Sequence, residues 1–343
     1  MKKNSSDRFL ELDVLRGLAA LGVLSYHYTT RYTELFSPAS PPLFKFPLGM
    51  YGVQLFFMIS GFVIFMTLGK TKRPLDFIVS RFSRLYPCYW VAIILTFTVI
   101  RILHLPGREA SLTDAGINFS MLQDWWSVRS VDGVYWTLPI ELSFYILMFV
   151  FFLTKNLKYI EIWGLAWLIF MVWSSRLLWI VHWHAPGWLK ISELLNYGHL
   201  FFAGILFYNL KTQGNAWYRH AGLVLCLVVQ YMIRVDNIGP MVVGVFFLIF
   251  YLFVLGKLSW IVNKPMIYLG TISYSGYLIH QNIGYIIIRY LYTVHANAYL
   301  RFIVPALCAI LIATAITYGV ERPAIVYIRQ KYKTWNQNKL VKD

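Results

Sequence analysis

The stretch LDVLRGLAALGVLSYHY (residues 12–28) is apolar except at Asp13, Arg16 and His27, and it decides the fold. Eleven residues separate Arg16 from His27, which is about three α-helical turns, so both side chains share one face about 16 Å apart. Asp13 precedes Arg16 by three residues and joins that face. A charged group inside a membrane span is costly and usually faces a protein interior or a watery cavity. The pattern therefore predicts a membrane helix with a polar stripe along one side.

The composition of the whole chain agrees with a membrane protein. Of 343 residues, 58% are hydrophobic and 13% are charged, about half the charged fraction of a typical soluble domain. Ten apolar blocks each approach the ~20 residues of a membrane span. They are residues 12–30, 48–69, 85–103, 134–153, 160–180, 196–210, 216–233, 238–256, 266–288 and 302–320. We predict an all-α, polytopic transmembrane bundle of about ten helices, with a membrane core over residues 1–330 and a basic cytoplasmic tail over residues 331–343.

The formal net charge of +16 follows from orientation. With the N-terminus inside and ten spans, most Lys and Arg residues fall in cytoplasmic connections, as expected for membrane proteins. This explains the charge without nucleic acid as a partner, and it predicts a multi-pass membrane protein with both termini cytoplasmic. Cys88, Cys226 and Cys308 lie in apolar blocks and have neither a disulfide framework nor metal-ligand spacing, so no metal site is expected.

Five polar residues are predicted to lie in the outer half of the membrane. With alternating span directions, His27, Gln54, Glu141, Arg176 and His280 reach a similar depth. The depth of a residue does not determine the direction of its side chain. The five residues therefore meet only if the sides of the helices that carry them are turned toward one another.

Most of these residues also have a structural interpretation. Arg176 could extend to the outer interface, Gln54 and Ser60 could join helices by hydrogen bonds, and His280 could be a satisfied interior histidine. Glu141 fits a structural role least well, because a carboxylate at that depth needs a partner or a proton.

The inner half contains an ordered pair of arginines in FIVSRFSRLYP (residues 77–87). Arg81 and Arg84 are three residues apart on one helical face, and guanidinium groups suit bidentate binding of phosphate. Anchoring by positive charge at the cytoplasmic surface is an equally good explanation. Arg16, low on the first helix, would complete a cationic mouth.

Six motifs in order resemble the acyltransferase-3 family of membrane O-acyltransferases. They are LDVLRGLAALGVLSYH, YGVQLFFMISGF, FIVSRFSRLYPCYW, YWTLPIELSFY, ISYSGYLIHQN and VERPAI. The resemblance implies a ten-helix core, acetyl-CoA or another acyl-CoA as a cytoplasmic co-substrate, no permanently bound cofactor, and an acceptor hydroxyl that is often on the far side. Members modify O-antigens, exopolysaccharides, peptidoglycan and some small molecules.

The resemblance also implies roles for particular residues. The family's functional His and Arg of the first helix match His27 and Arg16, its basic motif matches Arg81 and Arg84, and its carboxylate matches Glu141. The second-span motif often has an acidic residue where this chain has Gln54, so no catalytic acid is expected there.

We therefore predict an O-acetyltransferase of a bacterial inner membrane that acts on a glycan or lipid-linked sugar. His27 would act as general base or form an acyl-enzyme, with Glu141 orienting it or balancing its charge. The expected catalytic residues are His27, Glu141 and Arg16; the donor ligands are Arg16, Arg81 and Arg84; and the acceptor contacts are Arg176, Trp136, His280 and Gln54. Trp125, Trp126, Tyr135 and Trp136 would stack on sugar rings or form an interfacial belt.

Two other functions fit parts of the pattern. Intramembrane Arg, His and Glu also suit a transporter or flippase, although the chain shows neither internal repeats nor paired broken helices. An acyltransferase with a cytoplasmic small-molecule acceptor is the other alternative. The acceptor sugar, the acyl chain and the oligomeric state stay open.

Overall fold

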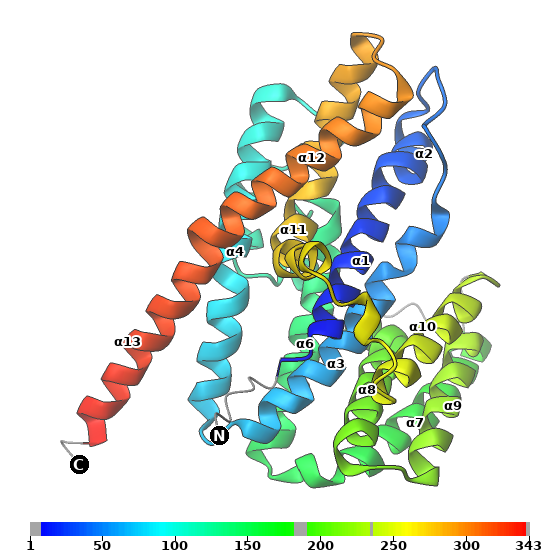
Figure 1. Cartoon of the computed structure of the whole chain (residues 1–343), viewed down its shortest axis with the longest axis vertical. Helices are drawn as coiled ribbons and strands as arrows, with labels where there is room; N and C mark the ends of the chain where they lie inside the picture. Colours follow the sequence, from blue (N-terminus) through cyan, green and yellow to red (C-terminus); the bar gives the residue numbers. More distant parts are fainter. Residues whose placement is uncertain (1–7, 182–190, 234–235, 341–343) are drawn as a thin grey trace.

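Helices make up the protein, as the computed structural model in Figure 1 shows. It describes residues 8–181, 191–233 and 236–340, and the side chains of these residues except 174–181, 191–195 and 339–340. The described residues contain no strand, and each of the ten predicted spans coincides with a long helix, so the all-α prediction is confirmed. These helices are α1 (Leu10–Tyr26), α3 (Gly52–Lys70), α4 (Pro74–Leu103), α6 (Thr137–Leu153), α7 (Ile160–Val181), α8 (Ile191–Gln213), α9 (Trp217–Met232), α10 (Gly239–Val254), α11 (Lys264–Thr293) and α12 (Ala298–Ile316).

Within the described residues, four helical segments are long and apolar enough to cross a membrane. They are Pro47–Lys70, Pro74–Leu103, Gly133–Leu153 and Ala298–Asn338. Helix α1 is shorter, with 17 residues, and includes Glu11, Asp13 and Arg16, so its polar stripe lowers its hydropathy. Such a stripe needs neighbouring helices around it before the helix can lie in a bilayer.

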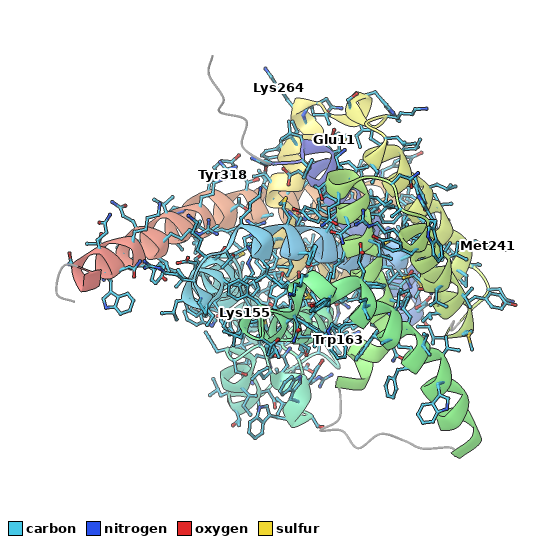
Figure 2. All side chains as sticks on the ribbon, turned by 90° about the horizontal axis from the view of Figure 1, so that it is seen from below. Glu11, Lys155, Trp163, Met241, Lys264 and Tyr318 are labelled. Carbon is cyan, nitrogen blue, oxygen red and sulfur yellow. The ribbon has the colours of Figure 1, made fainter. Side chains whose placement is uncertain are left out.

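Three further α-helices lie among the described residues. They are α2 (Tyr32–Phe36), α5 (Leu112–Asn118) and α13 (Arg322–Leu340). The last extends away from the bundle in both views (Figures 1 and 2). The segment predicted as a basic tail, as far as it is described, is the second half of this helix.

Helix α11 lies at the centre of the bundle and packs against α1, α4 and α12, while α3 packs against α1 and α8. Helix α6 contacts both α3 and α4. Helices α1, α3, α4, α6 and α11 therefore surround a common interior. Five of the six motifs lie mainly on these helices, and the sixth, VERPAI, follows α12.

Glycines allow the closest helix contacts. A Cβ on Gly61 of α3 would overlap with the carbonyl oxygen of Phe201 on α8, and one on Gly204 of α8 would overlap with that of Met58 on α3. On the other side of the bundle, Gly270 of α11 lies in the same way against the backbone of Asp13 in α1. Small residues at such interfaces let membrane helices approach backbone to backbone.

Gly204→Ala should destabilise the protein, because its methyl group would push α8 away from α3. We expect a loss of about 1–3 kcal/mol in the free energy of unfolding, the usual cost of overpacking, and a lower midpoint of thermal unfolding in detergent. Gly244→Ala on α10 is the matched control, because nothing lies within 4 Å of the added carbon and alanine favours a helix by up to about 1 kcal/mol. Equal midpoints for the two variants would contradict close packing at Gly204.

Two long helices each contain one π turn. The first, η1 (His27–Arg31), joins α1 to α2, and the second, η8 (Thr317–Glu321), joins α12 to α13. Such turns hold an extra residue and are frequent at functional sites. His27 begins the first turn and Glu321 ends the second, and both residues lie in motifs identified in the sequence.

Candidate active site

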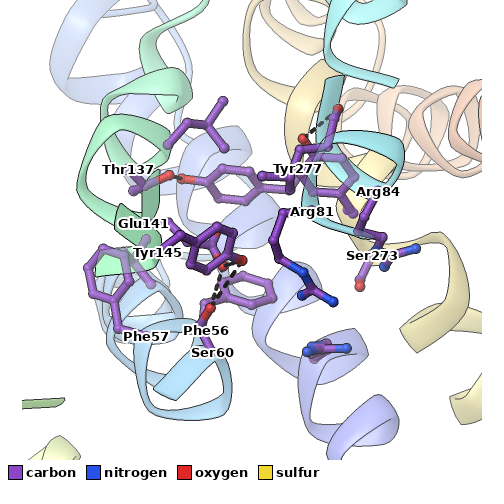
Figure 3. Close-up of a pocket in the computed structure, with 15 residues that line it drawn as sticks. Phe56, Phe57, Ser60, Arg81, Arg84, Thr137, Glu141, Tyr145, Ser273 and Tyr277 are labelled. Carbon is purple, nitrogen blue, oxygen red and sulfur yellow. Dashed lines mark hydrogen bonds between the residues drawn. The ribbon is translucent and has the colours of Figure 1, made fainter. Parts of the chain in front are cut away.

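A cavity of about 110 Å³ lies between the five central helices (Figure 3). Arg16 from α1 and Arg81 and Arg84 from α4 line it together with Glu141 from α6. The volume admits several water molecules. The three arginines predicted to form one cationic group are therefore brought together, and the carboxylate predicted to lie in the outer half joins them.

Two of these arginines already have carboxylate partners. The Arg84 guanidinium donates to Glu321, a side chain with 1% exposure at the end of η8. The Ser275 hydroxyl donates to the same carboxylate over 3.1 Å. Arg16 lies 3.7 Å from the Asp13 carboxylate, three residues earlier on α1. The positive charge of each side chain is thus partly balanced within the protein.

Arg81 differs from the other two. Among the described residues it has no carboxylate within 4.0 Å, and its Nη2 donates to the Ser80 hydroxyl over 3.1 Å. Its guanidinium lies 5.9 Å from the ring centroids of both Phe77 and Tyr145. Its Nε is buried without a hydrogen-bond partner in the described part of the chain. An unpaired buried donor is costly, so Arg81 is the arginine best suited to receive an anionic ligand.

Glu141 is held by two hydroxyl groups. Ser60 of α3 donates to Glu141 Oε1, and the Tyr145 hydroxyl, one turn further along α6, donates to the same oxygen over 2.5 Å (Figure 3). The structure gives Glu141 these two partners in place of the predicted contact with His27. Ser60, interpreted in the sequence as a packing residue, is a wall residue of the cavity.

His27 and His280 lie side by side. The Nδ1 atom of His27 lies 2.9 Å from the Val23 carbonyl oxygen and 3.1 Å from Nε2 of His280. The His280 Nδ1 atom lies 2.8 Å from the Tyr277 carbonyl oxygen. Tyr277 lines the cavity and its hydroxyl lies 2.9 Å from that of Thr137. The histidine pair therefore lies one turn of α11 beyond the cavity wall.

The predicted acceptor contacts lie on different elements of the chain. Gln54 lies on α3, and its buried Oε1 has no hydrogen-bond partner among the described residues. Trp136 is partly buried, and its ring centroid lies 5.7 Å from that of Tyr197. The side chain of Arg176 lies outside the described residues. An acceptor site formed by these residues stays a prediction.

Two of the aromatic residues predicted to lie in or beside the long outer loop differ in their exposure. Tyr135 has 0% exposure and packs edge-on against Tyr89, with ring centroids 5.0 Å apart. Stacking of Tyr135 on a sugar is excluded by this burial. Trp126 is 71% exposed, so its stacking on a sugar ring stays a prediction.

Several residues of the site were missed in the sequence. Tyr145 and Tyr274 line the cavity, but in the sequence they cannot be told from the many other aromatic residues of apolar helices. Glu321 had a signal, because it is a carboxylate directly after an apolar block and lies in the VERPAI motif. A carboxylate in that position needs a cationic partner.

A buried carboxylate links the segment that precedes α6 to α11. Asp132, with 0% exposure, accepts hydrogen bonds from the backbone N–H groups of Val134 (3.2 Å) and Asn282 (3.1 Å). The Asn282 amide returns a bond to the Val131 carbonyl oxygen over 3.0 Å. These contacts hold the start of α6 against the turn of α11 that follows His280.

Comparisons with known proteins agree with these features. A family described as an acyltransferase domain matches residues 9–322. The chain is 24% identical over 295 residues to a putative acetyltransferase, ORF330, of Acidianus two-tailed virus, covering 82% of this chain and 84% of that protein. It is 34% identical over 119 residues to protein 2 in the picA locus of Rhizobium radiobacter, covering 33% of this chain and 57% of the relative.

A third relative is the peptidoglycan O-acetyltransferase OatA of Listeria monocytogenes. It is 27% identical over 168 residues, which cover 44% of this chain and 25% of OatA. The match to the picA-locus protein and the match to OatA thus span less than two thirds of those relatives. No solved structure matches the chain.

Proposed function

Because the chain belongs to the acyltransferase-3 family, we propose that it moves an acetyl group from cytoplasmic acetyl-CoA to a hydroxyl of an extracytoplasmic or lipid-linked glycan. The observation that carries this proposal is an arrangement of residues from α1, α4 and α11. Three arginines line one cavity, and the partly buried His27 and the buried His280 lie about one helical turn beyond its wall. The protein would lie in a bacterial inner membrane with both termini in the cytoplasm.

The cavity suits the phosphate-bearing end of the donor. Arg81 offers a guanidinium without a carboxylate partner among the described residues, and Arg16 and Arg84 add positive charge beside it. Guanidinium groups bind phosphate through two parallel hydrogen bonds. Along α1, Arg16 and His27 are about 16 Å apart, a distance that a long, thin thioester arm can cover.

His27 would take the proton from the acceptor hydroxyl. As the oxygen attacks the thioester carbon, a C–O bond forms and the C–S bond breaks, and the departing thiolate receives the proton from His27. The products are the acetyl ester and free CoA, so protons and atoms balance. A positioned general base typically accelerates such a step by about 10²- to 10⁴-fold. Attack by His27 itself, through an acetyl-imidazole, is the alternative route.

The direct test is incubation of purified protein with radiolabelled acetyl-CoA and candidate glycans. The proposal expects label in the glycan and release of free CoA that depends on the acceptor. Reconstituted vesicles separate this function from transport, because a transporter or flippase would move its substrate without acetylating it. Label in a cytoplasmic small molecule but in no glycan would replace the proposed acceptor class.

Arg81→Lys should raise the KM for acetyl-CoA by about 10-fold and leave kcat nearly unchanged. Lysine keeps the positive charge but loses the guanidinium fork, and a charge-assisted hydrogen bond contributes about 1.5–3 kcal/mol. An effect on KM alone indicates an interaction present equally in the ground and transition states. The measurement is a donor titration at fixed acceptor.

Arg101→Lys is the matched control, since Arg101 is an exposed arginine at the opposite end of the same helix. Anchoring to the membrane surface depends on charge alone. If Arg81 serves only as an anchor, neither variant should change the KM for acetyl-CoA. A wild-type KM for Arg81→Lys would remove Arg81 from the donor site.

A further inference from the structure

We propose that His280 is a positioning residue that fixes the tautomer of His27 and leaves Nε2 of His27 as its basic nitrogen. The inference rests on the proposed function, in which His27 is the base. It follows from three contacts in a row, which run from the Tyr277 carbonyl oxygen through His280 to His27 and the Val23 carbonyl oxygen.

The tautomer of His280 is set by Tyr277. The His280 Nδ1 atom lies 2.8 Å from the Tyr277 carbonyl oxygen, and a carbonyl oxygen can only accept a hydrogen bond. Nδ1 therefore carries the proton in neutral His280. Its Nε2 then has a lone pair, and this atom points at Nδ1 of His27 over 3.1 Å.

The same reasoning assigns the proton of His27. Its Nδ1 atom faces two acceptors, the Val23 carbonyl oxygen at 2.9 Å and the His280 Nε2 lone pair at 3.1 Å. A bare Nδ1 would place lone pairs against each other on both sides. One proton on Nδ1, shared between the two acceptors, gives each of them a donor. Histidine tautomers are assigned from the hydrogen-bond network in this way. In neutral His27 the remaining lone pair is on Nε2.

This arrangement gives His280 a chemical role. When His27 Nε2 takes the proton of the acceptor hydroxyl, the ring becomes an imidazolium whose Nδ1–H still donates to His280. A group that accepts from the far nitrogen of a catalytic histidine holds its tautomer and orientation and stabilises the charged ring. When the CoA thiolate leaves, it takes the Nε2 proton and the network returns to its first state.

The two helices hold the pair in place. The Tyr28 hydroxyl, next to His27, donates to the His280 carbonyl oxygen over 2.8 Å. The Tyr28 ring lies against Gly284, where a Cβ would overlap with it. The turn that carries His27 is thus fastened to the part of α11 that carries His280. With 1% exposure and both ring nitrogens engaged, His280 is better placed to act on His27 than on the acceptor predicted for it from the sequence.

The tautomer itself is the first readout. In the detergent-purified, ¹⁵N-histidine-labelled protein, the signals of His27 are identified by their loss in His27→Gln. We expect a protonated Nδ1 and an unprotonated Nε2 in the wild type at a pH where the ring is neutral. The opposite tautomer in the wild type would overturn the proposal.

A pair of substitutions separates positioning from packing. The amide of glutamine reaches the position of His280 Nε2 and can accept from His27, whereas that of asparagine reaches the position of Nδ1 and cannot. We expect His280→Asn to mix the His27 tautomers and lower kcat by about 100-fold, with the KM for acetyl-CoA unchanged. His280→Gln should keep the wild-type tautomer and restore kcat to within about 10-fold of wild type, since orienting partners of functional histidines contribute about 10- to 100-fold.

If His280 has only a structural role, both variants should lose activity in parallel with their thermal stability, and the His27 tautomer should not change. This result would overturn the inference. Failure of the proposed function looks different. If the wild type transfers no acetyl group from acetyl-CoA to any acceptor, the kinetic comparison disappears, whereas the tautomer of His27 and its change in His280→Asn are still measured.

Discussion

His27→Ala is expected to reduce acetyl transfer by about 10²- to 10⁴-fold, the contribution of a positioned general base, while the protein still inserts and folds. The side chain contacts only Val23 and His280 through hydrogen bonds among the described residues, so its removal leaves the helix contacts of α1 in place. The measurement is acceptor-dependent CoA release, with thermal unfolding in detergent as the check on folding.

His199→Ala is the matched control. His199 is a fully buried histidine of α8 that contacts Gln230 over 2.8 Å and does not line the cavity. We expect this variant to lose stability but to keep turnover in its folded fraction. Near-normal turnover in His27→Ala would end both the general-base and the acyl-enzyme mechanisms.

Glu141→Gln should lower kcat by about 100-fold with a smaller effect on stability. The amide keeps the shape of the side chain but removes the negative charge from a cavity that contains three arginines. In a region of low dielectric constant, one charge changes the energy of every other charge that forms during the reaction. The measurement is kcat and donor KM at saturating acceptor.

Tyr145→Phe tests whether the charge or the hydrogen bond matters. This substitution removes one donor to Glu141 and keeps the carboxylate charged, so we expect a loss of no more than about 10-fold. If the two variants lose activity equally, or if Glu141→Gln keeps full activity, then Glu141 serves to join α3 and α6 through Ser60 and is not part of the chemistry.

The sequence predicts contacts well when both residues belong to one regular helix. The spacing of Arg81 and Arg84 places both on one face of α4, and both line the same cavity. The long apolar runs likewise correspond one by one to helices, because a membrane span must satisfy its backbone hydrogen bonds internally.

Contacts between helices were predicted less well. The sequence predicts the depth of Glu141 in the membrane but not the direction of its side chain. In the structure this side chain contacts Ser60 and Tyr145 rather than His27. The direction of a side chain depends on the rotation of its helix, which side-chain packing decides. Tyr135 illustrates the same limit, since an aromatic residue that was predicted to lie in or beside the outer loop is fully buried.

The π turns at residues 27–31 and 317–321 have a consequence for comparing this protein with its relatives. Each turn holds one residue more than the α-helical turn it replaces, so losing one residue there would close an ordinary α-helical turn and leave the residues beyond it in phase with the helix. A one-residue gap in an alignment at either place would therefore preserve the span but change the direction of the side chains within the turn itself, of which His27 and Glu321 are the first and last residues. Relatives with such gaps should differ in chemistry more than their overall identity suggests.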